Sequence, residues 1–211
     1  MERAQPGPGE ELNLGPVTPP RLAASVIVLR GGEQTLEVLL VQRNPAARFM
    51  GGAWVFPGGA VDAGDGEGEA ALRAAAVREA AEEAGIALED PAALLPFSRW
   101  ITPAVVKIRF DTWFFVAPAP PGAEPCVDGA ECVAWRWLTP LDALAAHAEG
   151  ELELVFPTIK HLEQLGGFAS AAALLDHARE REVVAVEPRV VLEGEVARVL
   201  LPGDPGYEAS A

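Results

Sequence analysis

Three glutamates near the middle of the chain have the type and spacing to bind a divalent cation. If their segment is helical, residues advance by about 100° each, so Glu79, Glu82 and Glu83 fall within one narrow sector. Like charges this close repel, by roughly 0.2–0.5 kcal/mol for each i,i+4 pair, and Arg78 can offset part of this through Glu82. A hard cation would offset more, because Mg²⁺ takes carboxylate oxygens and leaves sites for water and phosphate. A solvated acidic face is the alternative that the run by itself leaves open.

The glutamates belong to a stretch that predicts a helix preceded by a glycine-rich turn. An apolar stripe of Ala74, Val77, Ala81 and Ala84 is expected opposite the carboxylates, where it would pack against a sheet. Gly85 follows directly and suits the left-handed conformation that ends many helices. The segment is therefore predicted to carry an acidic face and a buried apolar face.

The residues around this helix resemble the Nudix hydrolases. Arg78-Glu79-Ala80-Ala81-Glu82-Glu83-Ala84-Gly85-Ile86 matches the second half of their sequence box, and Phe56-Pro57-Gly58-Gly59 precedes it in the right order. Gly59 lies nineteen residues before Arg78 where the family has fourteen, so about five residues within Ala63–Gly68 look inserted. In the family a glutamate braces the arginine, and Glu69 or Glu67 could take that part here.

The resemblance implies an α/β/α sandwich with a mixed sheet and a metal-dependent pyrophosphohydrolase activity. The implied metal ligands are Glu79, Glu82, Glu83 and the backbone carbonyl near Gly59, holding Mg²⁺ or Mn²⁺, and Arg78 would orient one of the glutamates. The cations would neutralise phosphoryl oxygens and make a water nucleophilic. The general base stays open: Glu82 on the helix is one candidate, and Glu131 and Asp128 in a later loop are others.

A narrower resemblance concerns the Nudix enzymes that cleave coenzyme A. Leu39-Leu40-Val41-Gln42-Arg43, then Arg48, Gly52 and Phe56-Pro57-Gly58-Gly59, partly match their motif, with correct spacing from Arg48 onward. Val41 and Asn44-Pro45 depart from it, and the gap before Arg48 is one residue short. The longer box loop also looks like the branch typified by the peroxisomal CoA diphosphatase. Arg43 and Arg48 are therefore candidate ligands of the substrate phosphates, in a reaction that would give 3′,5′-ADP and phosphopantetheine.

Two other functions remain open from the sequence. ADP-ribose, a dinucleotide or a nucleotide sugar could be the substrate of the same chemistry. A nucleotide sensor that binds without cleaving belongs to another class, and the presence of all three box glutamates weighs against it. Nudix relatives are often dimers, so the resemblance also leaves a homodimer open.

Composition and charge set limits on the partners. The 211 residues fit one domain, and an apolar content of 50% suffices for a substantial core. A net charge of −15 argues against nucleic acid or an anionic membrane as partner, though metal ions can bridge the protein to an anionic substrate. No apolar run of the sequence approaches the length of a bilayer span. Residues 1–20 lack the basic residues followed by an apolar stretch that mark a signal peptide, so we expect a cytoplasmic protein.

The order of elements predicts one domain with two extensions. Residues 1–20 are expected to be a flexible arm, and 21–211 a single Nudix domain whose C-terminal part, from about 153, is an appendage of helices and a β-hairpin. We expect strands at 22–30, 36–42, 53–56, 94–100, 108–117 and 131–138, a helix starting at Thr139-Pro140, helices at 158–165 and 170–181, and a final strand pair, 183–186 with 190–201.

Overall fold

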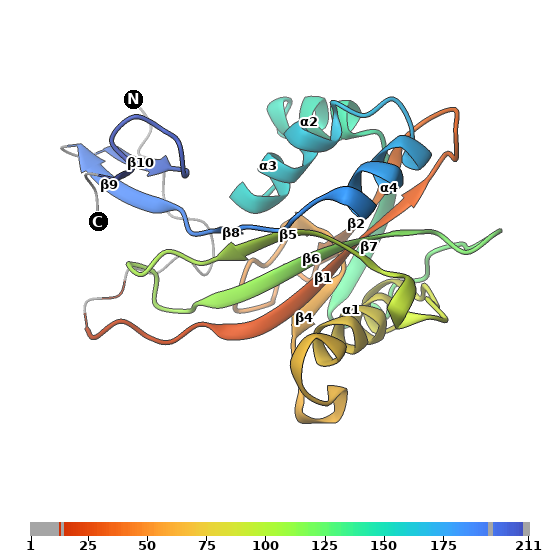
Figure 1. The fold of residues 1–211 in the computed structure, drawn as a ribbon, viewed down its shortest axis with the longest axis horizontal. Helices are drawn as coiled ribbons and strands as arrows, with labels where there is room; N and C mark the ends of the chain where they lie inside the picture. The colour runs from red at the N-terminus through yellow and green to blue at the C-terminus, as the bar shows by residue number, and fades with distance from the viewer. Residues whose placement is uncertain (1–12, 14, 194–195, 209–211) are drawn as a thin grey trace.

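A mixed sheet of eight strands forms the middle layer of the molecule (Figure 1). The computed structural model describes residue 13, residues 15–193 and residues 196–208. One helix, α1, covers one face of the sheet, and α2, α3 and α4 cover the other. The predicted α/β/α sandwich is confirmed. Its helices are α1 (Gly68–Ala84), α2 (Pro140–Ala148), α3 (Phe156–Leu165) and α4 (Ala171–Glu180), and its sheet strands are β1 (Arg21–Arg30), β2 (Glu37–Arg43), β3 (Trp54–Val55), β4 (Gly58–Ala60), β5 (Leu95–Ile101), β6 (Phe110–Pro118), β7 (Cys132–Leu138) and β8 (Ala185–Val186).

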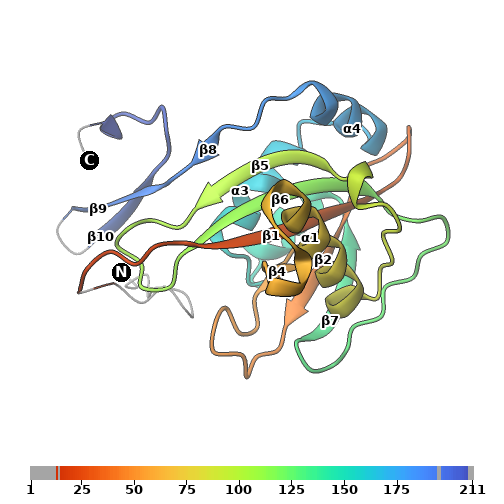
Figure 2. The same cartoon turned by 60° about the horizontal axis from the view of Figure 1, so that its bottom comes forward.

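Strand β1 lies at the centre and determines where the other strands fall. It runs parallel to β6 along its length and antiparallel to β2 near its C-terminal end, which confirms the predicted hairpin. On the same edge, nearer its N-terminus, it pairs with β4, so that Ala24 faces Gly59 and Ser25 faces Gly58. The two glycines are thereby fixed inside the sheet, beneath α1 (Figure 2).

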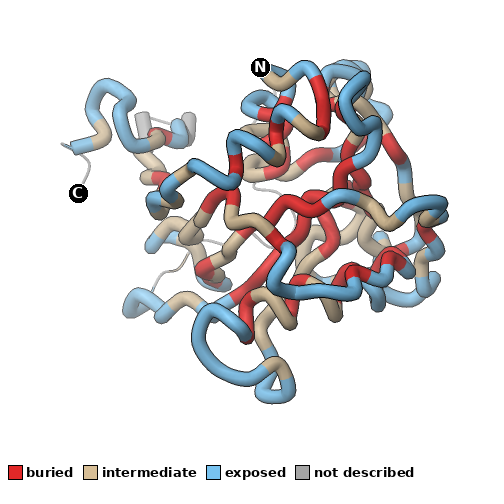
Figure 3. Tube along the Cα trace, turned by 45° about the vertical axis from the view of Figure 1, so that its right-hand side comes forward, coloured by how far each residue is buried: buried red, intermediate tan, exposed pale blue. Residues whose placement is uncertain are grey.

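Alternating residues of β1 pack into two separate hydrophobic cores, one on each face of the sheet. Ala24, Val26 and Val28 point to the α1 face, and Ile27 and Leu29 point to the face covered by the other helices. This alternation is the period-two pattern of a strand whose two faces are both covered. Figure 3 shows the buried residues running through the middle of the molecule.

The apolar side of α1 differs from the predicted stripe. Ala81 is exposed and Ala74 and Val77 are only half-buried. The buried side carries small residues together with two of the carboxylates; it consists of Ala71, Leu72, Ala75, Ala76, Glu79, Ala80, Glu83 and Ala84. Because alanine occupies so many positions of this helix, the sequence does not single out one apolar face.

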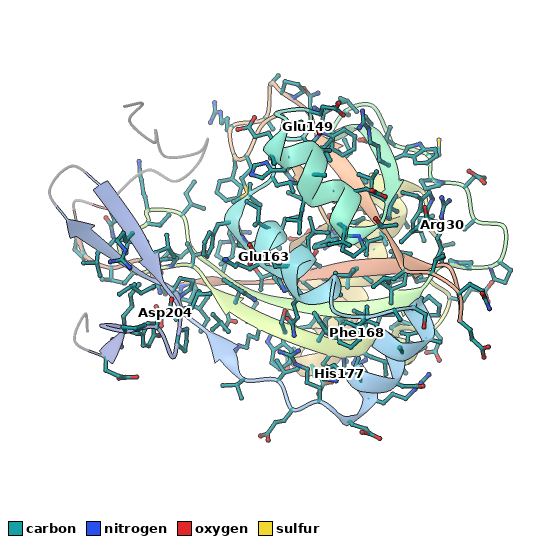
Figure 4. The ribbon with its side chains drawn as sticks, turned by 90° about the horizontal axis from the view of Figure 1, so that it is seen from above. Arg30, Glu149, Glu163, Phe168, His177 and Asp204 are labelled. Atoms are coloured by element: carbon teal, nitrogen blue, oxygen red, sulfur yellow. The ribbon has the colours of Figure 1, made fainter. Side chains whose placement is uncertain are left out.

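The C-terminal region is partly an integral layer and partly a projection. Leu162 and Leu165 of α3 and Leu174 of α4 are fully buried in the core, so these helices cover a whole face of the sheet and not merely one edge. The predicted pairing of the last strands was wrong. Strand β8 joins β5 in parallel, and β9 (Arg189–Glu193) pairs with β10 (Val196–Leu200) as a hairpin that extends to one side (Figure 4).

The start of the described chain is attached to the body of the protein. Most of the predicted flexible arm, residues 1–12 and 14, lies outside the described residues. Within the described part, the Thr18 hydroxyl donates to the Lys107 carbonyl, and buried Arg109 donates to the carbonyls of Thr18 and Thr102 and to the Glu187 carboxylate. Arg109 thus ties the N-terminal segment and the C-terminal region to the loop after β5.

In the part of the chain that the structure describes, no helix has the length and apolar character needed to cross a membrane.

His161 of α3 is buried among aromatic rings on the helical face of the sheet. Its Nδ1 lies 2.7 Å from the Pro157 carbonyl oxygen and its Nε2 lies 2.5 Å from the Ser98 hydroxyl of β5. The carbonyl can only accept, so Nδ1 carries the proton and the Ser98 hydroxyl donates to Nε2. Burial lowers the pKa of His161 from 6.5 to about 4, with a smaller contribution from the positive charge of Arg181. The ring is therefore neutral in the folded protein at pH 7.

This burial predicts an acid-sensitive stability. The folded state resists protonation of His161 whereas the unfolded state does not, so stability is present above pH 6.5 and is lost as the pH falls toward 4. Between pH 7 and pH 5 the contribution to the free energy of unfolding should fall by about 2 kcal/mol. Urea unfolding of His161→Gln should show a smaller loss over this interval than the wild type. The control is His177→Gln on the exposed side of α4 (Figure 4), which should keep the wild-type loss. A wild-type loss in His161→Gln would contradict this assignment.

Candidate active site

The C-terminal cap of helix α1 determines where the helix ends beside β4. Gly85 has a φ of 65°, and the amides of Gly85 and Ile86 donate to the carbonyls of Ala81 and Ala80. Only glycine adopts this left-handed conformation without cost, and the following apolar residue, Ile86, is buried. The predicted helix end is confirmed. The last turns of α1 consequently place Glu79 and Glu83 over the glycines of β4.

Glu83 is almost completely buried, with 1% of its surface exposed. One carboxylate oxygen accepts from the Gly58 amide at 2.9 Å, and the other lies 3.4 Å from the Arg43 guanidinium. These partners do not replace the lost water: burial raises the pKa of Glu83 from 4.5 to about 7, despite the opposing effects of the Gly58 amide and Arg43. The site holds a carboxylate whose negative charge is only partly compensated.

Glu79 is buried beside it, directly above Gly59. A Cβ atom at Gly59 would come within 2.4 Å of a Glu79 carboxylate oxygen, so any other residue would displace this side chain. Burial raises the pKa of Glu79, although Arg78 acts in the opposite direction. Gly59 is therefore required by close approach, and the space it leaves is filled by the carboxylate.

Arg78 is the main positive charge among these carboxylates. Its Nη1 donates to Glu79 at 2.7 Å and to Glu82 at 3.0 Å, which confirms the predicted i+4 pair with Glu82. Its Nε and Nη2 donate to the two oxygens of Asp65, at 3.1 and 3.0 Å. This pair lowers the pKa of Asp65 and raises that of Arg78.

The partner of Arg78 is thus neither of the glutamates that the sequence suggested. Glu69 pairs with Arg73 one turn further along α1, at 2.7 Å, and Glu67 is exposed before the helix. Asp65 follows Gly59 after five residues, which is the spacing of the family between its glycine and its glutamate. Counting forward from Gly59 therefore selects Asp65, whereas counting back from Arg78 across the longer loop suggested Glu69 or Glu67.

The remaining candidates lie at the exposed rim of the site. Glu82 and Glu131 are both exposed, and the charge of Glu131 contributes to the raised pKa values of Glu79 and Glu83, so it lies close to them. The Asp128 carboxylate instead accepts from the amides of Glu131 and Cys132. These hydrogen bonds lower the pKa of Asp128. They also hold the loop that carries Glu131.

The two arginines of the partial coenzyme A motif have different surroundings. Arg43, at the end of β2, reaches Glu83, and its buried Nε has no hydrogen-bond partner among the described residues. Arg48 lies in the loop between β2 and β3, exposed, with no ion pair to any described residue. The structure therefore brings Arg43 into the carboxylate cluster, whereas Arg48 lies at the surface and is available to a ligand.

The residues present fit a divalent cation. The buried Glu79 and Glu83 carboxylates each have one guanidinium partner, Arg78 and, at 3.4 Å, Arg43, and Arg78 is shared with Glu82 and Asp65. One oxygen of Glu79 has no hydrogen bond from the described residues, so a cation would supply the missing positive charge. Within the described part of the chain, no group of three or more acidic, histidine or cysteine side chains is arranged so that it could hold a metal ion by itself. Mg²⁺ tolerates this, because it usually keeps several waters and takes only one or two carboxylates together with substrate oxygens.

Comparison with known proteins gives a consistent result. Residues 19–157 match the family model of the NUDIX domain. The human protein named acyl-coenzyme A diphosphatase NUDT19 is 27% identical, over 81% of this chain and 72% of its own length. A NUDIX hydrolase from Alicyclobacillus acidocaldarius superposes with a TM-score of 0.67 at 29% identity, over 75% of this chain and 96% of that one. The MutT NUDIX hydrolase from Burkholderia pseudomallei gives 0.53 at 27% identity, over 70% and 98%.

The burial of Glu83 predicts that the metal-free protein loses stability as the pH rises from about 5 to 8. Its folded pKa of about 7 lies above the unfolded value of 4.5, so its stabilising effect is complete below pH 4.5 and is lost as the pH rises through 7. From pH 5 to pH 8, in a chelator, the wild type should lose on the order of 2 kcal/mol from this group. Glu83→Gln should abolish that component of the unfolding free energy, and Glu82→Gln, which is exposed, should retain it. Equal pH dependences for the wild type and Glu83→Gln would show that Glu83 is not the responsible group.

Proposed function

Because the chain belongs to the Nudix family and is therefore a pyrophosphohydrolase, we propose that Glu79, Glu82 and Glu83 bind Mg²⁺ or Mn²⁺ and that coenzyme A or acyl-CoA is the substrate. The observation that carries the metal assignment is the pair of buried, undercompensated carboxylates over Gly58 and Gly59. The backbone carbonyl near Gly59 is a further ligand in this proposal.

The chemistry divides between the cations and the protein. When bound, divalent cations neutralise the phosphoryl oxygens and lower the pKa of an attacking water. The protein would hold their carboxylate ligands in place, since the Gly58 amide donates to Glu83 and Arg78 donates to Glu79. Hydrolysis adds one water across the P–O–P bond, so one phosphate gains the water oxygen and the other leaves.

A proton must leave the attacking water, and Glu131 is the favoured acceptor. It is exposed at the rim and close enough to influence both buried glutamates. Asp128 is less suitable because backbone amides occupy its oxygens, and Glu82 remains the second candidate although it already accepts from Arg78. Because Glu82 is also a proposed metal ligand, the deciding variant is Glu131→Gln: lost turnover would support Glu131 as the base, and retained turnover would leave Glu82.

Two observations support coenzyme A over other pyrophosphates. Arg48 stands where the coenzyme A motif has an arginine and is exposed without an ion pair to any described residue. The human relative is named an acyl-coenzyme A diphosphatase. Cleavage would give 3′,5′-ADP and a phosphopantetheine, and the second phosphate group of that ADP would suit a cationic side chain.

A mass-spectrometric hydrolysis screen tests this proposal. The panel contains coenzyme A, acyl-CoA, ADP-ribose, NADH, diadenosine polyphosphates and a nucleotide sugar, each with Mg²⁺ or Mn²⁺. Release of 3′,5′-ADP from coenzyme A or acyl-CoA is the expected result. Preferred cleavage of ADP-ribose, a dinucleotide or a nucleotide sugar would reject the substrate and keep the chemistry. Saturable nucleotide binding without any cleavage would indicate the sensor.

Glu83→Gln should abolish turnover while the protein remains folded. The change removes the negative charge that holds the cation but keeps an oxygen to accept from the Gly58 amide. Activity and circular dichroism should be measured together. Glu69→Gln is the matched control, because Glu69 lies in the first turn of the same helix and its ion pair among the described residues is with Arg73, and it should retain near-normal activity. Full activity in Glu83→Gln would rule out the metal assignment.

Arg48→Ala should raise the KM for coenzyme A about tenfold and leave kcat nearly unchanged, because it removes a charge-assisted contact to phosphate worth roughly 1.5 kcal/mol. Steady-state kinetics checks this. Arg179→Ala, which removes another exposed cation, from α4, serves as control and should leave KM unaltered. An unchanged KM in Arg48→Ala would exclude Arg48 from substrate binding.

A further inference from the structure

The pairing of β2 with β7 brings two loops of the proposed site together. A register shift in this pairing sets Arg43 opposite Cys132 and leaves Val133 as an extra residue on β7. Such β-bulges bend a strand and occur often beside active sites. Beyond the bulge, β2 continues into the loop that carries Arg48, and the residue before β7 is Glu131. The candidate phosphate ligand and the candidate base therefore lie on neighbouring loops.

Asn44, the first residue after β2, joins these two loops by three hydrogen bonds. Its backbone amide donates to the Glu131 carbonyl at 2.8 Å, and its side-chain Nδ2 donates to the Ala130 carbonyl at 2.8 Å. Its Oδ1 accepts from the Ala46 amide at 2.9 Å. The last contact is the turn that asparagine often makes with the backbone two residues further on. One side chain thus shapes the start of the Arg48 loop and also reaches across to the other loop.

The loop that carries Glu131, residues 128–131, is otherwise shaped from within. The Asp128 carboxylate accepts from the amides of Glu131 and Cys132, and the Gly129 amide donates to the Cys132 carbonyl at 2.9 Å. The bonds from Asn44 instead fix this loop against the end of β2. That strand end also holds Arg43, whose guanidinium lies 3.4 Å from Glu83. Asn44 therefore sets the place of Glu131 relative to the buried carboxylates.

We propose that Asn44 is a positioning residue that holds the Glu131 loop against β2 and so keeps the Glu131 carboxylate beside the metal-site glutamates. This inference rests on the function proposed above, with Glu131 as the base. A base must lie within hydrogen-bond reach of the water that it deprotonates, and small displacements lower the rate. Asn44 is a position at which the chain departs from the coenzyme A motif, so the link is a feature of this chain.

The test compares the steady-state kinetics of Asn44→Ser with those of the wild type. A serine hydroxyl can still accept from the Ala46 amide but is too short to reach the Ala130 carbonyl. The substrate is coenzyme A, or whichever pyrophosphate of the panel the wild type cleaves. Loss of one hydrogen bond should lower kcat about fivefold. KM and Mn²⁺ binding, the latter measured by electron paramagnetic resonance, should stay near the wild-type values, because the turn before Arg48 and the metal ligands are kept.

Asn13→Ser is the matched control, because Asn13 makes the same kind of turn outside the proposed site. Its Oδ1 accepts from the Gly15 amide at 3.0 Å, and its Nδ2 donates to the Pro16 carbonyl at 2.8 Å. Its backbone amide donates to the Val105 carbonyl, in the loop after β5. This variant should keep the wild-type kcat. A fivefold loss in Asn13→Ser as well would overturn the inference.

A double-mutant cycle and hydrogen exchange separate positioning from general damage. In a Glu131→Gln background, Asn44→Ser should lower the residual kcat no further, because the group through which Asn44 acts is gone. Hydrogen exchange followed by mass spectrometry should show faster exchange at residues 129–132 in Asn44→Ser, with the rest of the chain as in the wild type. A further fivefold loss in the Glu131→Gln background would overturn the inference, as would unchanged exchange or unchanged kcat in Asn44→Ser. A wild type that cleaves no member of the panel would instead reject the proposed function, so the two failures are distinguishable.

Discussion

Two carboxylates buried side by side under one helix are the constraint on which the site depends. Glu79 and Glu83 lie against the backbone of Gly58 and Gly59, largely shielded from water, and their pKa values are raised by that burial. Burying a charge is costly unless an opposite charge compensates it. Arg78 beside Glu79 and Arg43 at 3.4 Å from Glu83 compensate only part of this charge, which supports the proposed cation site.

The fold creates this constraint through the central strand. Because β1 pairs with β4 on one edge and β6 on the other, the two glycines are held inside a sheet that is covered on both faces. The cap at Gly85 ends α1 at the point where its last two turns cross these glycines. The backbone of β4 therefore supplies both the space for Glu79 and the amide that fixes Glu83.

The sequence predicted the order of elements and the identity of the acidic residues more reliably than their surroundings. The hairpin, α1 and the Thr139 cap follow from local patterns, and the structure confirms them. The burial of Glu79 and Glu83 could not be predicted, because an alanine-rich helix does not reveal which side faces the sheet. The partner of Arg78 was predicted wrongly from the spacing before Arg78, although Asp65 stands five residues beyond Gly59, at the family's spacing, and pairs with Arg78 after the 3₁₀ turn η1 (Ala63–Asp65). The single-domain organisation, a homodimer and a cytoplasmic location stay predictions.

The most direct test of the account is a crystal structure of the protein grown with Mn²⁺ and examined by anomalous scattering. The account predicts a manganese peak in contact with the carboxylates of Glu79 and Glu83, with Asp65 still paired to Arg78. A peak elsewhere, or saturating Mn²⁺ with both buried carboxylates left without metal, would contradict the claim that their uncompensated charge is what recruits the cation.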